Sequence, residues 1–149
     1  MPKIDLASLA HTNGTGYPPE HAGPVAGRWY SRLAPLSGFA HLGASHVVLK
    51  PGAWSSQRHW HDGEDEMVVM LSGEAVLVED GTRSVMRAGD MAVFPAGVAN
   101  GHHLINESGE DCTFLALSAG PRTSGGYSDI DMIFEGDRFL HRDGTPFAD

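Results

Sequence analysis

The sequence predicts an all-β fold, a sandwich or barrel of many short strands, and two observations lead to this prediction. Nineteen glycines and nine prolines fall at short intervals between apolar runs in a chain of 149 residues. From Phe39 onward, short β-like runs alternate with turn signals such as Pro51-Gly52, Asp62-Gly63 and Ser72-Gly73. Short strands with tight turns and no repeat period are typical of sandwiches and barrels, and this length suits one domain.

The expected strands follow from apolar runs of the right length between turn residues. They cover 44–50, 54–61, 65–71, 74–79, 82–87, 90–95, 102–106, 112–118 and 129–134. The dipeptide Asp80-Gly81 is the strongest hairpin signal in the chain, because Asp-Gly suits a type I′ turn.

Two segments of different character are expected. Residues 1–38 are rich in Gly, Pro and small polar residues without a sustained period, so they are interpreted as an N-terminal arm. The apolar residues Trp29, Tyr30 and Leu33 predict that the arm packs on the barrel or on a partner subunit. Residues 39–149 are expected to form the barrel with a C-terminal strand and tail.

The run from Glu66 to Leu71 is apolar on both alternating faces once Glu66 is set aside. If Val68 and Met70 point into the barrel with Glu66, then the other face points outward and needs a cover. The arm or a second subunit could supply that cover, and a homodimer on this face is predicted.

Charge and cysteine content exclude several classes of function. The formal charge is −9 and no basic face is evident, so nucleic acids and anionic membrane surfaces are poor partners. Cys112 is the only cysteine, which rules out an internal disulfide and thiolate zinc sites and predicts a reducing cytosol. The N-terminus lacks the pattern of a signal peptide, and no apolar run approaches the ~20 residues needed to span a bilayer.

The segment from Ser55 to His61 carries the candidate site. On a strand, the two-residue period places Ser55, Gln57, His59 and His61 on one face, which is polar throughout. A hydrophobic core would not normally accept such a face, whereas two imidazoles at i and i+2 can converge on one ion. The Asp62-Gly63 turn then returns the carboxylate of Glu66 to the same neighbourhood, so the three side chains predict a metal chelate.

At this point the chain resembles the cupin superfamily. The first motif is Gly52 followed by His59-x-His61-x4-Glu66-x6-Gly73, and the second is Gly89-x5-Pro95-x-Gly97 followed by His102-x3-Asn106. The resemblance covers residues 44–118 and implies a double-stranded β-helix, or jelly-roll, barrel. The blocks 51–61, 100–106 and 127–131 are similar to a bacterial subgroup of unassigned function, whose members often carry labels such as sugar-phosphate isomerase.

The resemblance also implies a fourth ligand, but the second motif departs from the usual spacing. Asn100 stands where the motif usually has its histidine. Counting back from Asn106 selects His102, with His103 as the alternative because a bulge at Asn100-Gly101 could exchange the pair.

The ligand set then comprises His59, His61, Glu66 and His102. Three imidazoles and one carboxylate suit one divalent transition metal, and Fe, Mn, Ni, Zn and Cu all remain open. The expected function is a metal-dependent isomerase, lyase or dioxygenase acting on a small polar metabolite, with Gln57, Ser55 and Tyr127 as candidate catalytic residues. The alternative is a non-catalytic binding or sensing module.

Overall fold

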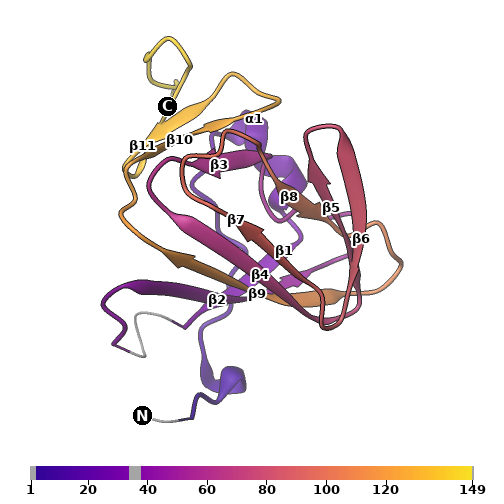
Figure 1. The fold of residues 1–149 in the computed structure, drawn as a ribbon. Helices are drawn as coiled ribbons and strands as arrows, with labels where there is room; N and C mark the ends of the chain where they lie inside the picture. Colours follow the sequence, from indigo (N-terminus) through magenta and orange to yellow (C-terminus); the bar gives the residue numbers. More distant parts are fainter. Residues whose placement is uncertain (1–2, 34–37, 149) are drawn as a thin grey trace.

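The structure is a computed structural model that describes residues 3–33 and 38–148 (Figure 1). The largest of its three antiparallel sheets contains five strands. The strand order is β1-β2-β9-β4-β7. The bounds are β1 (Arg28–Arg32), β2 (Leu42–Leu49), β4 (Asp65–Ser72), β7 (Met91–Phe94) and β9 (Cys112–Ala119).

Two smaller sheets complete the barrel. One has the order β12-β11-β10-β3, and the other has the order β6-β5-β8. An isolated bridge between His59 and His102 links β3 to the residue that precedes β8. The bounds are β3 (His59–His61), β5 (Glu74–Glu79), β6 (Thr82–Arg87), β8 (His103–Ile105), β10 (Ser124–Tyr127), β11 (Ile133–Glu135) and β12 (Arg138–Leu140). The predicted all-β barrel is confirmed.

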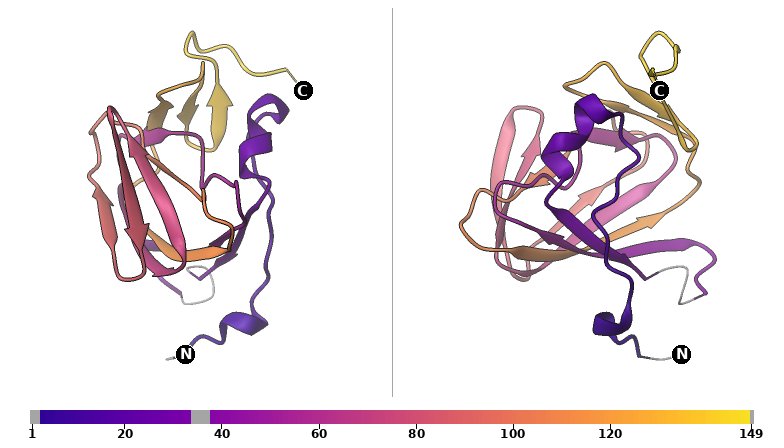
Figure 2. Two further views of the ribbon diagram at one scale, coloured as in Figure 1. Left: turned by 90° about the vertical axis from the view of Figure 1, so that its right-hand side faces the viewer. Right: turned by 180° about the vertical axis from the view of Figure 1, so that it is seen from behind.

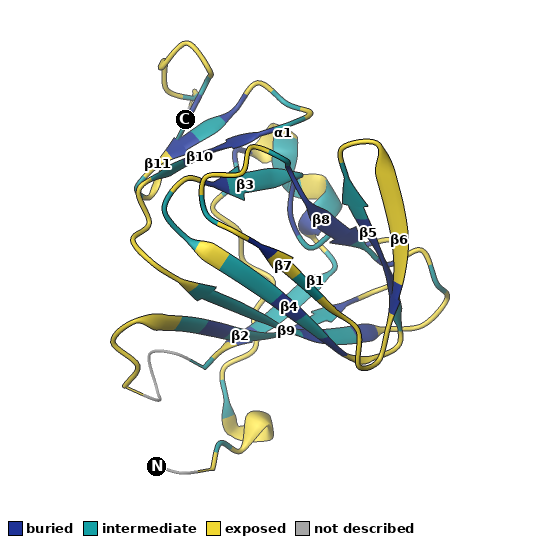
Figure 3. Ribbon diagram, in the orientation of Figure 1, coloured by how far each residue is buried: buried dark blue, intermediate teal, exposed yellow. Residues whose placement is uncertain are grey.

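The main core lies between the five-stranded sheet and the β6-β5-β8 sheet. Leu49 and Phe114 point inward from the first sheet and pack in one cluster with Leu77 and Leu104 from the second. Figure 3 shows the consequence for the outer strands, since β6 is exposed along most of its length whereas β8 is buried. The alternation of apolar side chains along β2 and β9 therefore closes the barrel by burying one face of each sheet.

The N-terminal arm runs along one side of the barrel (Figure 2). It contains η1 (Leu6–Ser8), α1 (Pro19–Ala22) and η2 (Gly23–Val25), and it continues into β1, which pairs with β2. A single bridge between Thr12 and Tyr30 adds the arm to the edge of the large sheet. The Tyr17 hydroxyl accepts the backbone N–H of Gln57, and the carbonyl of Pro24 accepts that of Trp54, so the described part of the arm packs on its own barrel. None of the helices among the described residues is long and apolar enough to cross a membrane.

Three local predictions were wrong. The strand predicted over 54–61 is regular only from His59 to His61, and the strand predicted over 129–134 is replaced by a hairpin of β10 and β11. The Asp80-Gly81 turn is not type I′, because Gly81 has φ of 69° but no described residue other than glycine has a positive φ. Tertiary contacts account for the turn, since the Asp80 side chain bonds Arg58 and its backbone N–H donates to Asn100.

Candidate metal centre

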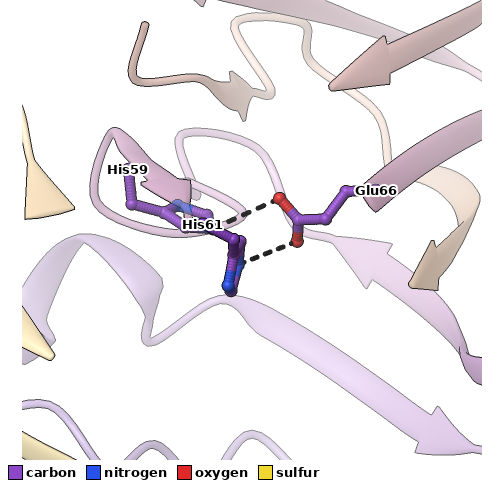
Figure 4. Close-up of side chains that lie close together, drawn as sticks. All are labelled: His59, His61 and Glu66. Atoms are coloured by element: carbon purple, nitrogen blue, oxygen red, sulfur yellow. Dashed lines mark ion pairs between the residues drawn. The ribbon is translucent and has the colours of Figure 1, made fainter. Parts of the chain in front are cut away.

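Three separate segments bring four polar side chains together inside the barrel. His59 and His61 lie on the same face of β3, and Glu66 points toward them from the start of β4 (Figure 4). His102 lies directly opposite His59, because the two residues exchange backbone hydrogen bonds of 3.0 and 3.2 Å. The turn at 62–64 therefore delivers Glu66, while the pairing of His59 with His102 delivers the third imidazole.

The Nε2 atoms of all three histidines face the carboxylate of Glu66. The distance is 2.8 Å from His102 to Oε2, 3.2 Å from His61 to Oε1 and 3.7 Å from His59 to Oε2. Neighbouring donors around an octahedral ion at ~2.1 Å lie about 3.0 Å apart. His59, His61 and Glu66 can also place one donor atom each within 4.8 Å of one another. These three side chains thus fit a single small cation, whereas His102 contacts Glu66 but is not part of the group whose donor atoms all lie this close.

Contacts on the other side of two rings determine which nitrogen is free. Nδ1 of His59 donates to the carbonyl of Gln57 at 2.9 Å and lies 3.1 Å from the hydroxyl of Ser56. Nδ1 of His61 lies 2.8 Å from the carboxylate of Glu64. When Nδ1 carries the proton, Nε2 of the neutral ring presents a lone pair. A lone pair facing a carboxylate is repulsive unless a cation, either a proton or a metal ion, lies between them.

Burial and charge pull in opposite directions on these groups. Burial lowers the pKa of His61, but its contacts with Glu64 and Glu66 outweigh burial and raise the pKa to about 9. Burial alone would raise the pKa of Glu66, yet hydrogen bonds from the three histidines lower it overall. Burial lowers the pKa of His102. The site therefore contains a carboxylate that stays ionised, with the positive charge held by His61 rather than by His102.

His102 and His103 point in opposite directions. The His102 ring stacks on Phe94 with centroids 3.5 Å apart and directs Nε2 at Glu66. His103 instead places Nδ1 2.9 Å from the carbonyl of Ser56 and packs edge-on against Trp54. Of the two histidines considered for the fourth position, the structure thus places His102 in the cluster and His103 outside it.

The three candidate catalytic residues occupy different environments. Gln57 is buried, but its side chain donates to the carbonyl of His21 and does not line the main cavity inside the barrel. The face predicted from strand alternation does not reach Gln57, because the chain before His59 is not a regular strand. Ser55 lines the cavity, and its hydroxyl accepts the backbone N–H of Leu104. Tyr127 pairs with His59 across β10 and β3, and burial raises its pKa.

The cluster lies in the wall of a cavity of about 550 Å³. Several residues that line it were missed at the sequence level: Tyr17, Arg28, Tyr30, Arg32, Glu64 and Arg122. Arg28 and Arg32 lie within residues 1–38, the segment that was interpreted as an N-terminal arm. The pattern Arg28-x-Tyr30-x-Arg32 does alternate with period two, which is the signal that could have marked a polar inward face of β1.

Comparisons with known proteins agree with this architecture. The cupin domain model matches residues 45–118. A crystal structure of a sugar phosphate isomerase of the cupin superfamily from Silicibacter pomeroyi is 38% identical, covers 99% of this chain and 97% of its own, and superposes with a TM-score of 0.92. A Cupin 2 conserved barrel domain protein from Salinispora arenicola is 27% identical over 80% of this chain and 87% of its own, with a TM-score of 0.58.

A polyketide cyclase from Streptomyces resistomycificus shares the fold with a TM-score of 0.70 at 16% identity, over 87% of each chain. No curated protein sequence gives a significant match. The barrel topology, the family model and the full-length similarity lead to one conclusion, that this chain belongs to the cupin superfamily.

Proposed function

We propose that this chain is a metal-dependent enzyme that acts on a small polar metabolite in the barrel cavity. The ligands of the metal are His59, His61, Glu66 and His102, and the metal is one divalent transition ion. One observation carries the proposal: three Nε2 atoms face one half-buried carboxylate at the edge of a 550 Å³ cavity. Imidazole and carboxylate donors without sulfur suit Fe, Mn, Ni, Zn or Cu.

In this proposal, the surrounding residues orient the ligating histidines and supply a hydrogen-bond donor. The carboxylate of Glu64 lies 2.8 Å from Nδ1 of His61, and the carbonyl of Gln57 accepts from Nδ1 of His59, so both rings hold Nε2 toward the ion. Tyr127 lines the cavity with its ring 5.8 Å from His59, and burial keeps its hydroxyl protonated as a hydrogen-bond donor. A bound divalent ion would supply polarisation of a substrate oxygen.

Isomerase, lyase and dioxygenase chemistry are all compatible with this ligand set. The relative from Silicibacter pomeroyi is described as a sugar phosphate isomerase, which makes isomerisation of a hydroxy-carbonyl compound the first reaction to assay. Keto acids and catechols form the other two parts of the substrate panel.

Elemental analysis of protein purified without oxygen tests the metal proposal. We expect close to one equivalent of a transition metal in the wild type and a strong loss in the His59→Ala variant. The matched control is His41→Ala, because His41 is exposed and lies outside the cluster. Less than about a tenth of an equivalent in the wild type, with none gained on reconstitution, refutes the site.

Turnover separates the enzyme from its alternative, a non-catalytic sensing module. Metal-loaded enzyme is expected to convert one class of the panel, and His59→Ala to abolish that conversion. Tight ligand binding without turnover in any class favours the sensor.

A cytosolic location remains a prediction from the lone Cys112.

We also propose a homodimer through the outward face of β4 and β7. Met67 and Val69 on β4 pair with Val93 and Met91 on β7, and the last two are 65% and 62% exposed. The described part of the arm follows the β1 edge and leaves this face open. Sedimentation of the wild type as a dimer and of Val93→Lys as a monomer is expected; Val85→Lys, on the exposed strand β6, is the control. A monomeric wild type at micromolar concentration refutes the dimer.

A further inference from the structure

We infer that the barrel cavity contains an oxyanion-binding subsite, with Arg28 as the hydrogen-bond donor and Arg32 as a second positive charge. The ligand of the cavity then carries a phosphate or carboxylate group in addition to the part that meets the metal. This inference rests on the proposed function, because it concerns the same cavity.

The charges around the cavity are opposite to those of the whole protein. The chain has 10 lysines and arginines against 19 aspartates and glutamates. The cavity lining has three arginines, Arg28, Arg32 and Arg122, against only Glu64 and Glu66. Both glutamates contact His61, so the arginines dominate the rest of the lining. A cavity with positive walls in an acidic protein attracts anions and concentrates them locally.

Arg122 is already paired, whereas the two arginines of β1 are not. Arg122 lies 3.4 Å from Asp137 and 3.9 Å from Glu64. Within the described ranges 3–33 and 38–148, neither Arg28 nor Arg32 has a carboxylate within ion-pair distance. The free positive charge of the cavity wall is therefore concentrated on β1.

Arg28 also has an unused donor. Its Nη1 donates to the carbonyl of Ser55 at 2.9 Å, which holds the guanidinium in place. Its Nε is buried without a hydrogen-bond partner among the residues that the structure describes. A buried N–H of a charged group is costly to leave unpaired, and an arginine fork is well matched to phosphate and carboxylate oxygens. An oxyanion in the cavity satisfies this donor.

Arg28 and Arg32 flank a common tyrosine. Their guanidinium carbons lie 5.3 and 5.8 Å from the centroid of the Tyr30 ring, and the Tyr30 hydroxyl donates to the carbonyl of Gly14. Two like charges near one ring, without a carboxylate between them, repel each other until an anion binds. Tyr30 thus acts as the rigid support that keeps both cations facing the cavity.

Arg28 and the proposed metal ligands line the same cavity. Arg28 bonds the carbonyl of Ser55, and the next residue, Ser56, contacts Nδ1 of His59. A small metabolite can therefore reach from the metal to Arg28 within one cavity. This geometry favours a ligand with a chelating end and an anionic end.

Calorimetric titration of the full-length, chelator-treated protein tests the subsite without any contribution from the metal. Inorganic phosphate and malonate are the two probes, which separate a phosphate from a dicarboxylate preference. We expect one probe to bind the wild type, and Arg28→Gln to weaken that binding by at least about tenfold, the effect of losing a charge-assisted hydrogen bond. Arg32→Gln should weaken it less, and added salt should weaken it in the wild type.

The matched control is Arg138→Gln, because Arg138 is an exposed arginine with an acidic neighbour, Glu135, 3.8 Å away. Arg32 is also exposed, so Arg32→Gln keeps the test valid if Arg28→Gln does not fold. Equal weakening in the control, or no binding of either probe, overturns the inference. Anion binding in a protein that takes up no metal refutes the metal proposal alone, and metal uptake without anion binding refutes the subsite alone.

Discussion

Replacing Glu64 with glutamine tests how the metal centre is held together. Glu64 does not face the proposed ion. Its carboxylate lies 2.8 Å from Nδ1 of His61, and its side chain is only 13% exposed. Glu64→Gln keeps the size of the side chain and removes its negative charge, so it weakens the contact that orients the His61 ring and makes Nε2 more basic.

The expected effect is a 10- to 100-fold loss of metal affinity, roughly 1.4 to 2.7 kcal/mol, as is typical for a carboxylate behind a ligating histidine. The upper part of that range is favoured here, because the contact is short and largely shielded from solvent. Arg122 lies 3.9 Å from Glu64 and would lose a carboxylate neighbour in the same variant. That added positive charge also disfavours a cation at the centre.

Competition with a chromophoric chelator measures the affinity directly. Glu135→Gln is the matched control, since Glu135 is an exposed glutamate with an arginine neighbour at i+3 and lies away from the cluster. Both variants are first compared with the wild type by thermal unfolding. Wild-type metal affinity in a folded Glu64→Gln variant contradicts the role assigned to Glu64.

Three further predictions concern stability and reactivity. Leu49→Ala removes a side chain that is 0% exposed and should lower the free energy of unfolding in urea by about 2 to 5 kcal/mol. In the control Leu42→Ala, at a residue that is 39% exposed, the free energy of unfolding should change by about 0.5 kcal/mol or less. Equal effects of the two variants would contradict the assigned core. Burial raises the pKa of the Cys112 thiol to about 11, so about a thousandth of the cysteine is thiolate at pH 8. Iodoacetamide should therefore react far more slowly with native than with urea-unfolded protein. Equal rates would contradict this burial. Arg58 donates twice to Asp129, and its side chain is 11% exposed, so Arg58→Ala should lower the free energy of unfolding by about 2 kcal/mol in the same urea assay. Arg58→Lys should restore less than half of that loss, because lysine lacks the planar guanidinium fork. Full rescue by lysine would contradict the contact through two nitrogens.

Much of the fold could be predicted because the relevant signals are local. The runs at 74–79 and 82–87 became β5 and β6 with the predicted bounds, since turn residues and apolar alternation mark both ends. The segments at 54–58 and 129–132 were predicted as strands but are irregular. Contacts from elsewhere hold them instead: the Gln57 backbone N–H donates to Tyr17, and Asp129 bonds Arg58.

The sequence by itself determined the first half of the candidate site. His59 and His61 share a face through the two-residue period of a strand, and the Asp62-Gly63 turn brings Glu66 back to them. All of this lies within eight consecutive residues, 59–66, so short-range geometry was sufficient. For the second half, the spacing to Asn106 selected His102 but left His103 open as the alternative.

Only the tertiary structure decided which distant side chains meet this centre. His102 is oriented by its pairing with His59 and its stacking on Phe94, and Arg28 reaches the cavity because β1 pairs with β2. Alternation along a strand tells which residues share a face, but it does not tell which segments close around that face. That information resides in long-range strand pairing, and it gave the site its third imidazole and its unpaired positive charge.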